Sequence, residues 1–233
     1  MGMVLLVVAV VSGALLIGAV WGIYGTLKPR TEGFLIALAG GALLLSVVSE
    51  LIEPSIQKST PFHALVGVAA GAIVFSVIDY LIDEKWGDSS GGGLLAAITL
   101  DGIPENLALG VALIGAGAPE VAALAGSILL SNLPEAAGGA RAMAEGGKSN
   151  ARVLALWGLT AIILSAAAIV GNVALKNVGE ETLAIIRCFA AGAVVASLAT
   201  EVFPQAYKED RHWAGIATAL GVILAFMLGA LGR

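Results

Sequence analysis

The sequence predicts an all-α integral membrane protein, and three observations lead to that prediction. Of the 233 residues, 58% are hydrophobic and only 12% are charged, which is too few ions to cover the surface of a soluble domain of this length. The apolar residues gather into stretches of about 20, the length that a helix needs to cross the hydrocarbon core of a bilayer. Glycine is frequent, at 31 residues, and small residues let membrane helices pack closely.

The apolar stretches predict a single transmembrane domain that occupies residues 1–233. We expect transmembrane helices at about 3–24, 33–52, 62–82, 94–116, 121–143, 153–175, 183–203 and 213–231. The connections are short, and the longest Gly, Ser and acidic stretch runs over 83–93. No Lys or Arg precedes the first apolar stretch, so we interpret that stretch as a retained span rather than a cleaved signal peptide.

The distribution of Lys and Arg predicts the orientation of these spans, because cytoplasmic loops hold an excess of both residues. With the N-terminus outside, the inner side holds most of the basic residues: Lys28, Arg30, Lys85, Arg141, Lys148, Arg152, Lys208 and Arg211. We therefore expect both termini to be extracytoplasmic, in a cell (inner) membrane.

Two pairs of spans resemble each other. The stretch AGGALLLSVVSELIEP at 39–54 matches AAGAVVASLATEVFP at 190–204, which aligns Glu50 with Glu201. The fourth span contains DGIPEN at 101–106 and the fifth contains SNLPEA at 131–136. Both pairs would cross the membrane in opposite senses, as inverted-topology repeats do, and such repeats place substrate sites near mid-membrane. Chance similarity between two Ala/Gly/Leu-rich helices is the alternative for the first pair.

Three acidic residues, Asp101, Glu105 and Glu135, lie near the middle of the expected spans. An acid at the centre of a spanning helix costs about 2.5–3.5 kcal/mol, so such residues face the interior of the bundle and mark ion or proton pathways. Asp101 and Glu105 are four residues apart and share a helix face, and Ser131 and Glu135 have the same spacing. Each helix should therefore present a stacked pair of oxygen ligands.

The residues beside these acids add neutral oxygen atoms. Pro104 and Pro134 each leave the carbonyl four residues back without its helical donor and should kink the helix. Asn106 and Asn132 are further candidate ligands. Carboxylates with neutral oxygens, and without His or Cys, suit Mg²⁺, Mn²⁺, Fe²⁺ or Ca²⁺, and less selectively Zn²⁺. Two alternatives remain open: Pro-Glu pairs that only hold helices together, and a proton relay without metal.

Other charged residues lie nearer the ends of the spans. We expect Glu50 and Glu201 to flank the central site as outer and inner intermediate sites on the ion pathway. The alternative is that both are solvated interfacial acids. Asp79 is expected to be solvated at the inner end of the third span. Arg141 and Glu145, four residues apart at an inner helix end, are expected to form a surface ion pair.

Paired Pro-Glu motifs on spans four and five of an eight-span chain resemble the ZIP (zinc/iron-regulated transporter-like) family of metal transporters. The family motif is close to His-Asn-x-Pro-Glu-Gly on both helices. Here Asp101 and Ser131 stand at the His positions, and Asn106 and Ala136 at the Gly positions. The resemblance implies eight helices in a 3+2+3 inverted-repeat arrangement and a two-metal or one-metal site on spans four and five. It also implies elevator-like or alternating-access transport and a homodimer. The substitutions indicate one oxygen-only site whose metal need not be zinc.

We therefore expect a transporter of a divalent metal cation (Zn, Fe, Mn or similar) that moves through the carboxylate site on spans four and five. A cation channel or facilitator, or a proton-conducting membrane protein, would use the same acidic pathway. The metal is cargo, and no prosthetic group is expected. The expected partners are the ion, the lipid bilayer and a second copy of the chain. The sequence offers no HExxH pair and no nucleophile–base pair, so an enzyme is not expected, and nothing suggests nucleic-acid binding.

Overall fold

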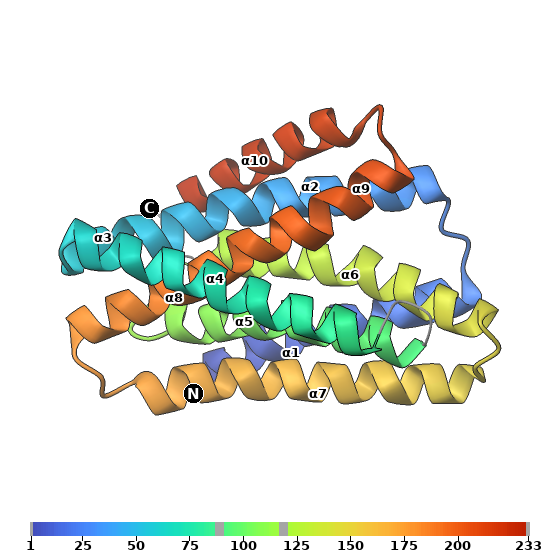
Figure 1. Ribbon diagram of the computed structural model, residues 1–233, viewed down its shortest axis with the longest axis horizontal. Helices are drawn as coiled ribbons and strands as arrows, with labels where there is room; N and C mark the ends of the chain where they lie inside the picture. Colours follow the sequence, from blue (N-terminus) through green and yellow to red (C-terminus); the bar gives the residue numbers. More distant parts are fainter. Residues whose placement is uncertain (1, 87–90, 117–120, 232–233) are drawn as a thin grey trace.

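The computed structural model describes residues 2–86, 91–116 and 121–231, and every regular element in those ranges is a helix (Figure 1). The eight long helices are α1 (Gly2–Tyr24), α2 (Pro29–Val47), α4 (Pro61–Trp86), α5 (Gly91–Ala112), α6 (Ala122–Glu145), α7 (Asn150–Leu175), α8 (Glu180–Ser197) and α10 (Ala214–Leu231). They fall on the eight apolar stretches of the sequence. Residues 87–90, within the expected 83–93 connection, lie outside the described residues.

Two of the long helices continue beyond their α-helical part. After α2 the chain passes through a π-helical segment, η1 (Val48–Ile52), into the short helix α3 (Glu53–Lys58). After α8 it passes through a second π-helical segment, η3 (Leu198–Val202), into α9 (Phe203–Glu209). The two π-helical segments lie at positions that align in the sequence, and π-helical turns occur frequently at functional sites.

The helices have the length and composition of an integral membrane protein. In the described part of the chain, five helical stretches are long and apolar enough to cross a membrane: Gly2–Tyr24, Pro29–Lys58, Pro61–Ile82, Asn150–Leu175 and Glu180–Glu209. Ala214–Ala230 is a shorter apolar helix. The π-helical segments therefore lie within long apolar rods and not in loops.

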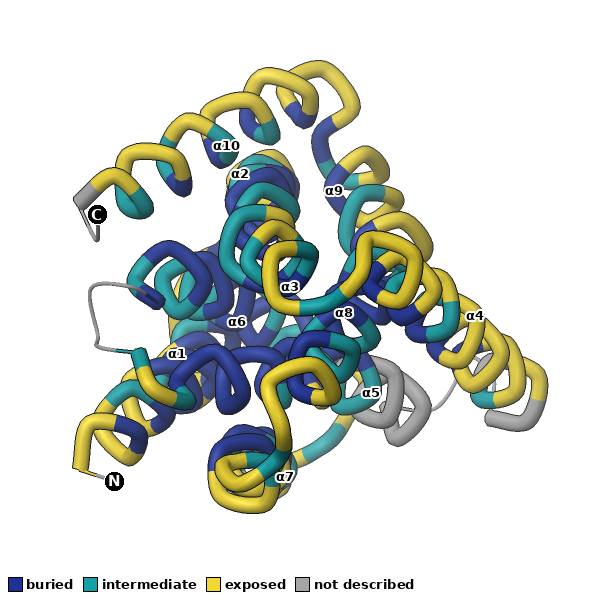
Figure 2. Tube along the Cα trace, turned by 90° about the vertical axis from the view of Figure 1, so that its left-hand side faces the viewer, coloured by how far each residue is buried: buried dark blue, intermediate teal, exposed yellow. Residues whose placement is uncertain are grey.

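Helix α6 lies near the middle of the bundle when the molecule is viewed end-on (Figure 2). It packs against α1 and α2, while α5 packs against α7 and α8. The pairs α2–α10 and α4–α8 complete the assembly. In Figure 2 the outer surfaces of α4, α7 and α10 are largely exposed, whereas α6 is largely buried. The apolar outer helices thus enclose α6 and place its polar residues in the interior.

The outer helix pairs approach each other closely at glycines. A methyl group at Gly41 would overlap the backbone carbonyl of Thr218 on α10, and one at Gly192 would overlap the carbonyl of Val68 on α4. Gly41 and Gly192 are aligned in the sequence repeat. Close backbone contact at an aligned glycine therefore joins α2 to α10 and α8 to α4, as small residues do in membrane bundles.

Candidate functional site

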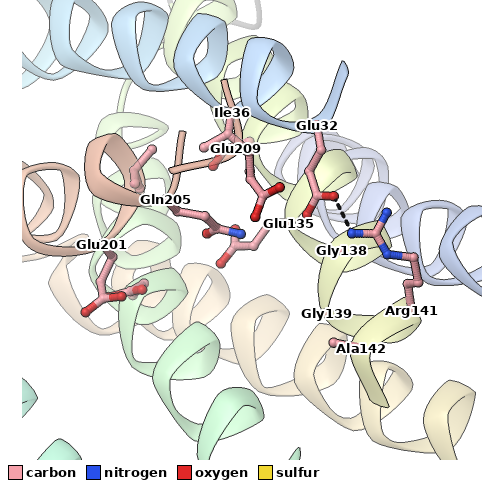
Figure 3. Close-up of a pocket in the computed structure, with 13 residues that line it drawn as sticks. Glu32, Ile36, Glu135, Gly138, Gly139, Arg141, Ala142, Glu201, Gln205 and Glu209 are labelled. Atoms are coloured by element: carbon pink, nitrogen blue, oxygen red, sulfur yellow. Dashed lines mark hydrogen bonds and ion pairs between the residues drawn. The ribbon is translucent and has the colours of Figure 1, made fainter. Parts of the chain in front are cut away.

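A cavity of about 220 Å³ lies between α2, α5, α6 and the η3–α9 continuation of α8 (Figure 3). Charged and polar side chains from all four elements reach it. Its lining residues are Glu32, Ile36, Asp101, Ser131, Glu135, Gly138, Gly139, Arg141, Ala142, Glu201, Val202, Gln205 and Glu209.

Four of the residues singled out by sequence line this cavity together: Asp101 from α5, Ser131 and Glu135 from α6, and Glu201 from η3. Asp101 and Ser131 are buried, and Glu135 and Glu201 are partly buried. Asp101 interacts electrostatically with both Glu135 and Glu201, and Glu135 interacts with Glu201. Three acidic side chains from three helices therefore share one electrostatic environment inside the bundle.

Glu105 and Asn106 lie deeper, one turn beyond Asp101 on α5, and do not line the cavity. Glu105 is 4% exposed, and it interacts electrostatically with Asp101 and Glu135. The Asn106 amide nitrogen donates to the carbonyl of Gly102 at 2.9 Å. Its Oδ1 atom is buried and accepts no hydrogen bond from a described residue. A buried amide oxygen without a donor is available to an ion or a water molecule.

Asn132 connects two helices, and the two prolines lie within helices. The Asn132 amide nitrogen donates to the carbonyl of Val11 at 3.0 Å, which ties α6 to α1. Pro104 and Pro134 lie inside α5 and α6, and both helices continue through them as α-helix. The carbonyls of Leu100 and Leu130 have no helical hydrogen-bond donor at these positions, because proline has no backbone N–H.

The acids around the cavity do not form a closed coordination shell. Among the described residues, no three His, Cys, Asp or Glu side chains lie close enough together to hold one metal ion. The arrangement is an acidic, partly open chamber. Carboxylates of this kind attract cations, and side-chain movement would be needed to bring three of them onto one ion.

Glu50 lies in a different cavity, of about 320 Å³, which also includes Lys58 and Arg187. Its Oε1 atom accepts a hydrogen bond from the backbone N–H of Leu124 at 3.0 Å, in the first turn of α6. Glu32 and Glu50 are 18 residues apart on one helical rod, or about 27 Å at 1.5 Å per residue. The two cavities therefore lie toward opposite ends of the bundle, with Glu50 at one and Glu201 at the other.

The structure corrects two expectations about charged residues. Arg141 does not form the expected surface pair with Glu145; its Nη2 donates to Glu32 Oε2 at 2.8 Å and its Nη1 to the carbonyl of Leu27 at 2.5 Å. The pairing with Glu32 wins because Glu32 is 3% exposed and needs a partner, whereas Glu145 is solvated. Asp79 is 8% exposed and not solvated, and it interacts electrostatically with Asp101 on α5.

Three further residues line the cavity that were not predicted from the sequence: Glu32, Gln205 and Glu209. Glu201, Gln205 and Glu209 are spaced four apart, so their common helix face was visible in the sequence. Glu32 carried no such signal. It lies 109 residues from Arg141 in the chain and stands in the first turn of its helix, where an acidic residue is common for helix-dipole reasons.

No protein-family model matches the chain, and comparison with curated proteins found no match. The assignment of function therefore depends on the site itself.

Proposed function

We propose that this protein transports a divalent metal cation across a membrane, with the ion as its substrate. The observation that carries the proposal is the convergence of Asp101, Glu135 and Glu201 on one cavity inside a bundle of apolar helices. Burying acids in such a bundle is costly, and proteins retain them there for ion or proton pathways. A role limited to holding helices together would not require a cavity between them.

The chemistry of the chamber favours a hard cation. The carboxylates and the Ser131 hydroxyl that line it are oxygen donors, and one turn deeper the unpartnered Oδ1 of Asn106 is another. Oxygen donors suit Mn²⁺, Mg²⁺, Ca²⁺ and Fe²⁺, and they bind Zn²⁺ with less selectivity than imidazole or thiolate. At about 30 Å³ for each molecule of liquid water, a cavity of about 220 Å³ has room for an ion that keeps part of its hydration shell.

We infer further that the bundle is a 3+2+3 inverted repeat of the ZIP type, in which the first three long helices correspond to the last three. The packing supports this inference. The pairs α1–α6 and α2–α10 would correspond to α7–α5 and α8–α4, and all four pairs are in contact. The aligned glycines, Gly41 and Gly192, and the aligned segments η1 and η3 agree with the same correspondence.

In this arrangement the acidic cavity opens toward the end that carries Lys28, Arg30 and Lys208, which the positive-inside pattern assigns to the cytoplasm. Glu50, bound to the N–H of Leu124, would then lie on the extracytoplasmic side of the central acids. A cation would pass from the Glu50 region to Glu105 and Asp101, and leave past Glu201. Alternating exposure of the central carboxylates to the two cavities would move it.

The proposal is tested by reconstituting the purified protein in liposomes and measuring uptake of Mn²⁺, Zn²⁺, Fe²⁺ and Ca²⁺. Transport should saturate with ion concentration and rise steeply with temperature, because a carrier must change conformation in each cycle. Flux that does not saturate and depends weakly on temperature would indicate a channel. Acidification of the lumen without metal uptake would indicate a proton pathway.

Asp101 offers a test of ion selectivity. Asp101→His should increase the preference for Zn²⁺ over Mn²⁺ in uptake, because it places an imidazole where the chain has an oxygen ligand. Competition between the two ions in the liposome assay measures the change. Asp101→Asn, which removes the charge without adding an imidazole, is the control and should not favour Zn²⁺. An unchanged ratio in Asp101→His would mean that Asp101 does not contact the cargo.

A further inference from the structure

The ion pair between Arg141 and Glu32 stands at the cytoplasmic side of the acidic cavity in the orientation proposed above. Arg141 lies six residues beyond Glu135 on α6, or about 9 Å farther along the helix. Both members of the pair line the cavity (Figure 3), and Glu32 Oε2 accepts the Arg141 Nη2 hydrogen bond at 2.8 Å. An ion that leaves the central carboxylates toward this end would move through the part of the cavity that the pair lines.

Arg141 is held in place by more than its ion pair. Its Nη1 donates to the carbonyl of Leu27, in the connection between α1 and α2. Glu32 Oε1 lies next to Gly138 on α6, in space that a methyl group at position 138 would occupy. The pair therefore joins α6 to α2 and to the α1–α2 connection. A guanidinium fixed by two acceptors is a positioned charge and not a mobile surface side chain.

The charges that line the cavity are unbalanced. Five described lining residues are acidic: Glu32, Asp101, Glu135, Glu201 and Glu209. Among the lining residues that the structure describes, Arg141 alone is basic. The guanidinium is permanently protonated, so it supplies one fixed positive charge to an otherwise anionic chamber. Within the cavity, that charge is paired with Glu32.

From these observations we propose that Arg141 is a built-in cation gate and that Glu32 is a further cation-binding carboxylate, occupied by Arg141 until an ion displaces it. This inference rests on the proposed transport of a divalent cation. As the ion leaves the cavity, it displaces Arg141 and binds the Glu32 carboxylate. After the ion has dissociated, Arg141 pairs with Glu32 again and repels cations that approach from the cytoplasmic side. No bond is made or broken covalently; the carboxylate exchanges one cation for another.

The gate is tested by thiol labelling, which does not depend on transport. Ile36 lines the cavity one turn beyond Glu32, so Ile36→Cys in a Cys188→Ala background places a reporter about 6 Å from that carboxylate along the helix. The rates of reaction with a cationic and an anionic methanethiosulfonate reagent of equal size are compared as a ratio. Gln205→Cys, at an exposed position on the same cavity, is a second reporter in case the thiol introduced at position 36 reacts too slowly.

Two variants break the same ion pair but change the charge in opposite directions. Arg141→Gln should raise the cationic-to-anionic ratio by about fivefold or more, as expected for a unit charge a few ångströms away at intermediate dielectric. Glu32→Gln should lower the ratio, because Arg141 is then uncompensated. The double variant should return close to the parent value. Arg152→Gln, which removes an exposed positive charge at the start of α7, is the matched control and should leave the ratio unchanged.

A purely structural ion pair would give a different pattern, in which both single variants accelerate both reagents and leave the ratio unchanged. That result overturns the gate. Mn²⁺ uptake by the same variants separates the gate from the proposed function. Arg141→Gln should lower the KM for Mn²⁺ supplied from the Glu32 side, and Glu32→Gln should raise it. Absence of uptake of any tested divalent cation by the parent protein contradicts the transport function, whatever the labelling ratios show.

Discussion

Glu135→Gln should reduce divalent-metal uptake into liposomes by at least about 30-fold. Glu135 lines the acidic cavity and interacts electrostatically with Glu105 and Glu201, so its charge acts on the space that a cation would occupy. Removing one charged partner from a buried site costs about 2 kcal/mol or more, and about 1.4 kcal/mol is a factor of ten. The amide keeps the size and polarity of the side chain, so the loss should come from binding and not from folding.

The matched control for this prediction is Glu180→Gln, which neutralises an exposed carboxylate at the start of α8. Its uptake should equal that of the parent. Thermal unfolding of both variants in detergent, followed by circular dichroism, checks that the helices remain intact. Parent-like uptake by the Glu105→Gln/Glu135→Gln double variant would show that the central acids do not bind the cargo.

Gly41→Ala and Gly192→Ala should each lower the thermal stability of the protein by several degrees. A methyl group at either position overlaps a backbone carbonyl of the neighbouring helix, and backbone cannot move aside as a flexible side chain would. Overpacking of a buried contact costs about 1–3 kcal/mol or more, and each kcal/mol corresponds to roughly 2–4 °C for a chain of this length. Because the two glycines occupy corresponding helix pairs, the two losses should be similar.

Gly13 and Gly158 provide the comparison for these variants. A methyl group at either position would have no atom within 4 Å. Alanine also has the higher helix propensity, so Gly13→Ala and Gly158→Ala should not lower stability. Equal unfolding temperatures for all four alanine variants would mean that the helix pairs do not depend on close backbone contact at Gly41 and Gly192.

The helices could be predicted from the sequence because their physical cause is local. A run of about 20 apolar residues forms a helix in lipid whatever its neighbours are, since every backbone polar group must be satisfied within the segment. The π-helical segments were not predictable in this way. Their positions coincide with Glu50 and Glu201, but the sequence does not distinguish a π-helical turn from an α-helical one.

The site could be predicted in part, where the acids stand out against their surroundings. Asp101 and Glu135 are conspicuous because a charge in mid-span is expensive, and the structure places both on one cavity. Glu32 and Arg141 stand near helix ends, where charged residues are common, so neither stands out in the sequence. Only the packing of α2 against α6 brings them together, and that long-range contact has no local signature.

The most direct test of cation binding by the central carboxylates is an anomalous-scattering measurement on crystals grown with Mn²⁺. We expect an anomalous peak at ligand distance from Glu135 and from Asp101 or Glu105, after side-chain movement has brought their oxygens together. The peak should disappear in crystals of Glu135→Gln grown under the same conditions. Peaks confined to exposed acids, at Mn²⁺ concentrations that saturate uptake, would contradict the central site.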